Sequence, residues 1–228
     1  MQKRRVVVTG LGCISPVGNN VDEFWSSLNA GKSGVETITV FDPKDMPVKF
    51  SASVKDFEPE KYFDIKEQRK LDIFMQYGMA AGIDAISDAG LTESSIDLER
   101  VGVAIGSGIG GLSSIEKTYE TYLKSGAKRI SPFFIPATII NMISGNLSIK
   151  YGYKGPNLSI VTACTTGTHN IGDAFRQIQY SHADIMICGG AEMATTHLGI
   201  GGFAAARALS TRNDDPKAAS RPWDINRD

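Results

Sequence analysis

The sequence has few cysteines and histidines and no excess of either charge. Its 228 residues include three Cys and three His, and its 24 basic residues nearly balance its 25 acidic residues. Three cysteines form no disulfide framework, and no Cys/His spacing fits a zinc site, so we expect no metal. The balanced charge argues against a general nucleic-acid binder. The rare cysteines indicate a reducing, cytoplasmic compartment.

Long apolar runs are also missing. No stretch approaches the ~18 residues of a membrane span. The basic start is followed by a short apolar run and then by glycines, which does not fit a secretory signal. Hydrophobic residues are 42% and charged residues 21%, an ordinary globular balance. We therefore expect a folded protein without a membrane partner.

Glycine, by contrast, is abundant, with 24 residues where average usage predicts about 16. Several β-branched runs end in glycine and are followed by stretches with helical spacing. This alternation predicts an α/β fold with a largely parallel sheet. Strands are expected at 4–9, 101–105, 158–162 and 184–188, helices at 21–30, 66–89, 112–125, after Pro136 and at 165–180, and a small hairpin within 32–64.

The strongest candidate for chemistry is Cys164, where a predicted strand meets a predicted helix. The first amides of a helix lack internal partners and carry partial positive charge, so they stabilise a thiolate and can hold an oxyanion. Small neighbours such as Ala163 and Gly167 permit a sharp turn. A small buried thiol without chemistry fits the same pattern about equally well. Cys13 and Cys188 are interpreted as buried thiols.

No acid–base partner for this thiol is evident. His169 follows Cys164 by five residues, about 500° of helical rotation, so it faces elsewhere and is interpreted as structural. His182 lies in a polar turn, and His197 belongs to no pattern. The sequence thus shows a nucleophile without a base.

The glycine loop, residues 106–111, reads GSGIGG and matches the dinucleotide pattern G-x-G-x-x-G after a strand and before a helix. A nucleotide-binding oxidoreductase is therefore an alternative. However, Lys128 and Arg129 stand near where that pattern needs an acidic residue. The glycines equally suit a close-packed wall for a slender apolar ligand.

Basic residues are clustered at a predicted helix start. Cations at this position interact unfavourably with the helix dipole, which suggests that they serve another purpose. Solvated charge is the plain interpretation, and docking of an acidic partner is the functional one. The residues are Lys66, Arg69 and Lys70, with Lys128, Arg129 and Arg207 as further basic points.

Five motifs together resemble the β-ketoacyl-(acyl carrier protein) synthases, above all the elongating group called synthase II. They are VTACTTG (161–167), GSGIGG (106–111), ISPFF (130–134), AARALS (205–210) and SRPWD (220–224). The resemblance covers essentially the entire chain. It implies a thiolase-like α/β fold, with residues 1–228 forming the amino-terminal βαβαβ-type half of a five-layered α-β-α-β-α sandwich in a cytoplasmic homodimer.

The resemblance also implies an acyltransferase of fatty-acid biosynthesis. Cys164 would take an acyl chain as a thioester, with its own N–H in the oxyanion hole, and condense it with malonyl-acyl carrier protein as carbon dioxide leaves. No cofactor is implied beyond the carrier's phosphopantetheine arm. The implied acyl pocket comprises Ile109, Phe134, Ile135 (from the other subunit), Ala163, Gly199 and Phe203. The implied carrier-binding residues are Lys66, Arg69, Lys70, Lys128, Arg129 and Arg207.

The family is about twice as long as this chain, and its catalytic histidines, lysine and gating phenylalanine belong to the other half. We therefore expect an amino-terminal fragment that is inactive in condensation when alone. A non-catalytic module that binds a carrier protein or a partner subunit remains the alternative.

Overall fold

The computed structural model describes residues 3–92 and 95–228. The chain divides into two compact units, the first formed by residues up to Gly12 with Glu58–Met193, the second by Cys13–Phe57 with Ala194–Asp228. Among the described residues, no helix is both long enough and apolar enough to cross a membrane. Short 3-10 helices lie at Pro59–Lys61, Leu98–Arg100, Ala127–Arg129 and Ala163–Thr165.

The first unit is built on a parallel sheet, as the alternating pattern predicts, and its three strands lie in the order β4-β3-β5. The central strand β3 (Val101–Gly106) is buried along its whole length. It pairs with β5 (Ile185–Gly190) over six residues and with β4 (Asn157–Leu158) over two. The strand predicted at 158–162 is therefore much shorter than expected.

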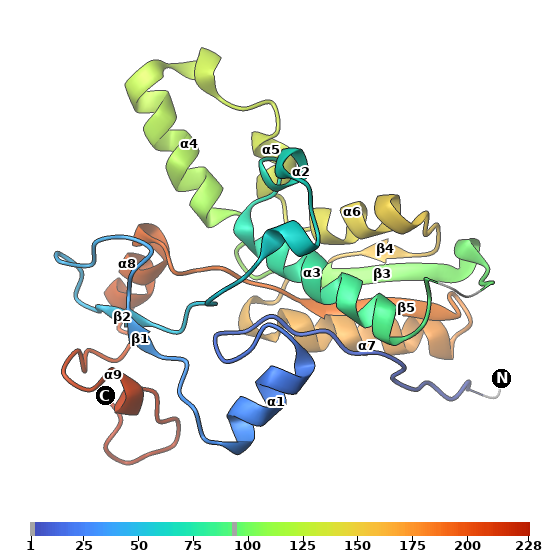
Figure 1. Ribbon diagram of the computed structural model, residues 1–228, viewed down its shortest axis with the longest axis horizontal. Helices are drawn as coiled ribbons and strands as arrows, with labels where there is room; N and C mark the ends of the chain where they lie inside the picture. Colours follow the sequence, from blue (N-terminus) through green and yellow to red (C-terminus); the bar gives the residue numbers. More distant parts are fainter. Residues whose placement is uncertain (1–2, 93–94) are drawn as a thin grey trace. The chain divides into compact units, whose positions relative to one another are not determined.

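Helices cover both faces of this sheet (Figure 1). The Ile105 side chain reaches toward Gly82 of α3 (Ile73–Asp88), whereas a Cβ on the next residue, Gly106, would meet Asn170 of α7 (Thr166–Gln179). Consecutive strand residues point to opposite faces, so α3 and α7 lie on opposite sides. Helix α6 (Met142–Tyr151) packs beside α3. The core includes Phe74, Met75, Ile86, Val101, Val103, Ile143 and Leu147.

The single helix predicted over 66–89 is wrong, because the chain forms α2 (Ile65–Gln68) and then α3. Asp64 and Glu67 form a capping box at the first start, and Asp72 caps the second by accepting from the Phe74 N–H. Two capping signals eight residues apart make the helix stop and restart. Small residues let α3 pack closely on α6, since a Cβ on Gly78 would lie 2.6 Å from Ile143 Cδ1 and one on Gly82 would lie 2.7 Å from Leu147 Cδ1.

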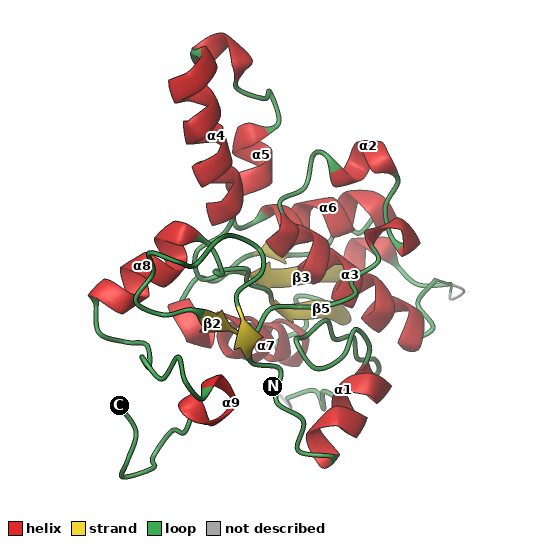
Figure 2. Cartoon of the chain, turned by 60° about the vertical axis from the view of Figure 1, so that its left-hand side comes forward, coloured by secondary structure: helices red, strands yellow, loops and turns green. Residues whose placement is uncertain are grey.

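Helix α4 (Leu112–Ser125) has the predicted bounds. It contacts α5 (Phe134–Thr138), and the pair extends away from the sheet (Figure 2). Helix α6 confirms the helix predicted after Pro136, whereas the short helix α5, which begins at Phe134 and includes Pro136, was not predicted. Proline fits within a first helical turn, where the backbone N–H needs no intrahelical partner.

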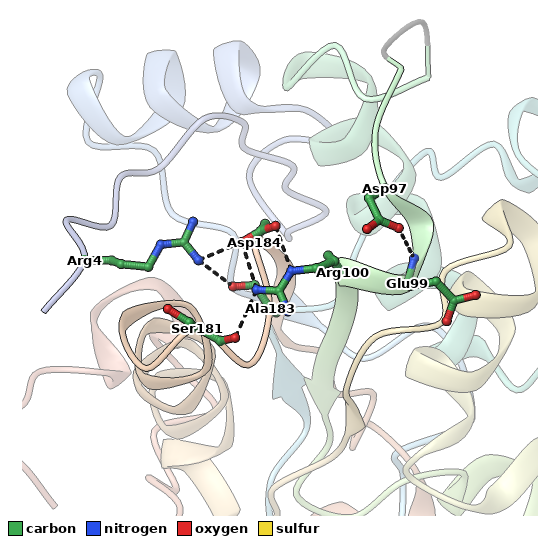
Figure 3. Close-up of polar contacts among 7 residues, drawn as sticks. All are labelled: Arg4, Asp97, Glu99, Arg100, Ser181, Ala183 and Asp184. Atoms are coloured by element: carbon green, nitrogen blue, oxygen red, sulfur yellow. Dashed lines mark hydrogen bonds and ion pairs between the residues drawn. The ribbon is translucent and has the colours of Figure 1, made fainter. Parts of the chain in front are cut away.

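The buried strand predicted at residues 4–9 is wrong. This segment has no regular secondary structure and no strand partner in the described structure, and the Val8 side chain is 78% exposed. β-Branched residues favour a strand only where a partner edge is available. Arg4 anchors the segment, since its guanidinium bonds one Asp184 oxygen at 2.6 Å while Arg100 Nε bonds the other at 2.8 Å (Figure 3).

The second unit contains α1 (Val21–Asn29), close to the predicted bounds, and Asn20 caps it by accepting from the Glu23 N–H. Strands β1 (Glu36–Thr37) and β2 (Phe50–Ser51) pair antiparallel and confirm the small hairpin. Helix α8 (His197–Ala205) was not predicted, because its three glycines weaken helix propensity. The short helix α9 (Pro216–Ala219) follows it. Ile38, Val48 and Ile200 form the core of this unit.

Candidate functional site

Cys164 lies at a sharp turn immediately before α7, as the sequence predicts. It is the middle residue of the 3-10 turn Ala163–Thr165, and α7 begins at Thr166. Ala163 has a φ of 52°, a left-handed conformation that non-glycine residues rarely adopt. Strained backbone of this kind is common beside nucleophiles that are held on a turn.

Asn170 holds the segment that leads into this turn. Its fully buried side chain accepts from the Ile160 N–H at 3.0 Å and donates to the carbonyls of Ile160 and Thr166 at 2.9 and 2.8 Å. Thr166 Oγ1 also accepts from the Thr162 N–H. The approach to Cys164 is thus tied to the first turns of α7. Helical spacing did not reveal this role, because it depends on contacts with a preceding loop.

The Cys164 thiol is the exposed one of the three cysteines, whereas Cys13 and Cys188 are partly buried. Burial raises the pKa of the Cys13 and Cys188 thiols above the ordinary value. The Cys164 N–H makes no hydrogen bond among those of the described residues. It therefore remains available at the helix start, where an oxyanion donor is predicted. The nucleophilic role of Cys164 stays a prediction.

Neither His169 nor His182 hydrogen-bonds to Cys164 in the part of the chain that the structure describes. His169 Nδ1 lies 2.7 Å from Thr162 Oγ1, a contact that agrees with a structural role. His182 contacts Gln177 in an exposed turn. His197 begins α8 in the second unit.

The glycine loop binds an internal carboxylate. Glu192 accepts from the Gly108 and Ile109 amides at 2.9 and 3.0 Å and from Ser107 Oγ at 2.8 Å. These are the donors that a nucleotide phosphate would need, so the loop argues against the nucleotide alternative. A Cβ on Gly108 would lie 3.2 Å from the Ala163 backbone, which fits a close-packed wall. The sequence pattern did not indicate Glu192.

The structure groups four of the predicted acyl-pocket residues in the first unit. Ile109 lies in the glycine loop, next to the glycine that packs on Ala163. The loop also reaches α5, which begins with Phe134 and Ile135, because the Gly111 N–H donates to the Thr138 carbonyl at 3.1 Å. The other two residues, Gly199 and Phe203, lie on α8 in the second unit.

The predicted carrier-binding residues are all exposed, and no ion pair is described for any of them. Lys70 Nζ lies 5.0 Å from the centre of the Phe133 ring, which links the end of α2 to the start of α5. The residues Lys66, Arg69, Lys70, Lys128 and Arg129 belong to the first unit, and Arg207 belongs to the second.

Residues 3–228 match the family model "Beta-ketoacyl synthase, N-terminal domain". The chain is 60% identical to a protein of Coxiella burnetii and 56% identical to one of Vibrio cholerae, both named 3-oxoacyl-[acyl-carrier-protein] synthase 2. Each alignment covers 100% of this chain and 55% of the relative. The chain therefore spans about half the length of these curated relatives.

Solved structures give the same result. A beta-ketoacyl synthase from Burkholderia phymatum matches with a TM-score of 0.86 and 28% identity, over 100% of this chain and 56% of that one. A type II polyketide ketosynthase in complex with its acyl-carrier protein matches with a TM-score of 0.78 and 28% identity, over 92% and 58%. The chain has a thiolase-like α/β fold and belongs to the beta-ketoacyl synthase family.

Proposed function

We propose that this protein elongates fatty-acyl chains by decarboxylative Claisen condensation and that Cys164 carries the growing chain. The observation that supports this most directly is the exposed thiol at a strained turn, beside a backbone N–H that has no hydrogen-bond partner among the described residues. Membership of the family agrees with it.

In the first step, the Cys164 thiolate attacks the carbonyl carbon of an acyl thioester on acyl carrier protein. The carbonyl oxygen becomes an oxyanion, which accepts a hydrogen bond from the Cys164 N–H at the positive end of α7. Collapse of this intermediate breaks the bond to the carrier's sulfur, which leaves and takes up a proton. The acyl chain then lies along Ile109 and Ala163.

In the second step, malonyl-carrier protein loses carbon dioxide, and the resulting enolate carbon attacks the Cys164 thioester. A carbon–carbon bond forms, and the bond between the acyl carbon and the Cys164 sulfur breaks. The product is a β-ketoacyl chain two carbons longer. The protein contributes the leaving Cys164 thiolate and one oxyanion donor, the Cys164 N–H. The groups that stabilise the enolate are expected in the part of the relatives with no counterpart here, so the 228-residue chain alone should not release carbon dioxide.

The proposed partner is acyl carrier protein, which would dock on the exposed carrier-binding residues named above. Its phosphopantetheine arm would bring the acyl group to Cys164, so the proposal needs no separate cofactor. One structural neighbour is a ketosynthase in complex with an acyl-carrier protein. We further propose a cytoplasmic homodimer, with Ile135 reaching the pocket of the other subunit.

The test joins this chain to the carboxy-terminal part of the Coxiella burnetii relative and supplies acyl- and malonyl-carrier proteins. We expect β-ketoacyl product and equimolar carbon dioxide, and loss of the product in the Cys164→Ala variant. Undiminished product from Cys164→Ala would contradict the proposal. Carrier binding by the 228-residue chain without any Cys164 thioester would instead favour a non-catalytic binding module.

A further inference from the structure

The carboxylate of Glu192 lies where two neighbouring parallel strands end. Gly106 of β3 and Gly190 of β5 are register partners, and the Ala191 N–H donates to the Gly106 carbonyl at 3.0 Å. Because parallel strands end at the same edge of a sheet, the loop after β3 and the residues after β5 meet there. Glu192 is thereby brought to the glycine loop from 85 residues further along the chain.

This carboxylate binds consecutive donors of the loop. One oxygen accepts from Ser107 Oγ at 2.8 Å, and the other accepts from the Gly108 and Ile109 amides at 2.9 and 3.0 Å. Ser107, itself 1% exposed, also accepts from the Gly110 N–H at 3.0 Å. Hydrogen bonds to an ionised acceptor are stronger than neutral ones. No cation is paired with Glu192 among the described contacts. The donors of the glycine loop are therefore the groups that stabilise its carboxylate.

The glycine loop, residues 106–111, packs against the turn that holds Cys164. A Cβ on Gly108 would lie 2.8 Å from Glu192 Oε2 and 3.2 Å from Ala163 Cα, so Gly108 is close to both that carboxylate and the residue before Cys164. Ile109 follows directly. A change at Glu192 would therefore reach both the turn that presents the thiol and the predicted wall of the acyl pocket.

We infer that Glu192 is a positioning residue whose carboxylate fixes the glycine loop against the Cys164 turn, and so sets which acyl chains reach the thiol. It acts through the loop and takes no part in the bond changes. The inference deepens the proposed function and rests on it for the acyl chain. The placement of the loop by Glu192 can be tested separately.

The first test measures hydrogen–deuterium exchange in the Glu192→Gln variant of the 228-residue chain. Glutamine retains one acceptor oxygen but turns an N–H toward the loop donors. We expect amide exchange within 106–111 to rise at least about tenfold, while exchange in 101–105 stays as in the native chain. The control Glu120→Gln removes an exposed carboxylate that pairs with Lys124 on α4, and it should change neither segment. Native exchange within 106–111 in Glu192→Gln would overturn the inference.

A variant that unfolds would exchange throughout, so Ser107→Ala provides a second test. It removes one donor to Glu192 and one acceptor for the Gly110 amide. We expect faster exchange within 106–111 in this variant too, and unchanged exchange there would likewise overturn the inference.

The second test compares acylation of Cys164 by carriers bearing short and long acyl chains. We expect Glu192→Gln to slow transfer of the long chain about tenfold more than that of the short chain. Alkylation by iodoacetamide, which needs no pocket, should stay within about twofold of native. Equal slowing at every chain length would contradict a role in selecting acyl chains. Absence of acylation in the native chain would contradict the proposed function and leave the exchange result standing.

Discussion

At the scale of the residue, the three cysteines differ in exposure. Burial raises the pKa of Cys13 and Cys188, so both hold less thiolate near neutral pH, whereas Cys164 is exposed. We predict that limiting iodoacetamide at pH 7 modifies Cys164 at least about tenfold faster than either other thiol, as peptide mapping would show. Faster modification of Cys13 or Cys188 would count against Cys164 as the reactive thiol.

Asp184 gives a prediction about pH. Hydrogen bonds from Arg100 and Arg4 hold the pKa of its carboxyl well below the usual range. Because the folded-state pKa is depressed, the stabilisation is present above the unfolded pKa of about 4 and is lost as pH falls further. Since the ion pairs are 44% exposed at Asp184, solvent screens them.

The Asp184→Asn variant should therefore melt about 2 °C below the native chain at pH 7. The difference should shrink as the pH is lowered from about 4 toward 3, because the Asp184 carboxyl then takes up a proton in the unfolded state while it stays ionised in the folded state, which favours unfolding. Thermal unfolding followed by circular dichroism measures it. A difference in melting temperature that is the same at pH 7 and pH 3 would show that these ion pairs do not account for the destabilisation.

Which residues were predictable follows from how far apart their partners lie. The Cys164 turn was predictable, because a helix start and a sharp turn are encoded by adjacent residues. Glu192 and Asn170 were not, because each acts on a loop reached only through the fold. The predicted role of His169 as structural agrees with its contact to Thr162.

At the scale of the element, the close approach of β5 and α7 sets the position of Cys164. A Cβ on Gly190 would lie 2.9 Å from Gly167 Cα and 3.0 Å from its N, and both are backbone atoms that cannot rotate away. We predict that Gly190→Ala displaces the first turn of α7, costs about 1–3 kcal/mol of stability and slows Cys164 acylation.

The matched control is Gly172→Ala. Gly172 lies within α7 itself, and a Cβ there would have open space around it. It should leave acylation unchanged and stabilise the helix by about 0.5–1 kcal/mol. Chemical unfolding and the acylation rate measure both variants. Native acylation in Gly190→Ala would show that this contact does not place the thiol.

Elements were predictable where local signals agree and wrong where they need a distant partner. Helix α4 has continuous helical spacing and strand β3 is a continuous apolar run, and both match their predicted bounds closely. Residues 4–9 have strand composition but no partner edge in the described structure. Helix α8 has a capping residue, Thr196, but the glycines of the helix lower its helix propensity, so the sequence did not indicate a helix there. The break between α2 and α3 could have been anticipated from Asp72, which the apolar spacing concealed.

At the scale of the whole molecule, the proposed carrier-binding residues give an electrostatic prediction. Lys66→Glu with Arg69→Glu reverses two exposed charges, and we expect carrier-protein affinity to fall about tenfold or more at low salt, and less at high salt. Lys32→Glu with Lys44→Glu makes the same change in net charge at other exposed positions and should leave affinity nearly unchanged. Equal losses from both double variants would point to net charge alone.

The most direct measurement is the mass of the 228-residue chain after incubation with acyl-carrier protein, followed by peptide mapping. The account predicts one acyl group per chain, attached to Cys164 and released by hydroxylamine as expected for a thioester. An acyl group on any other residue, or no adduct although the carrier binds, would contradict it.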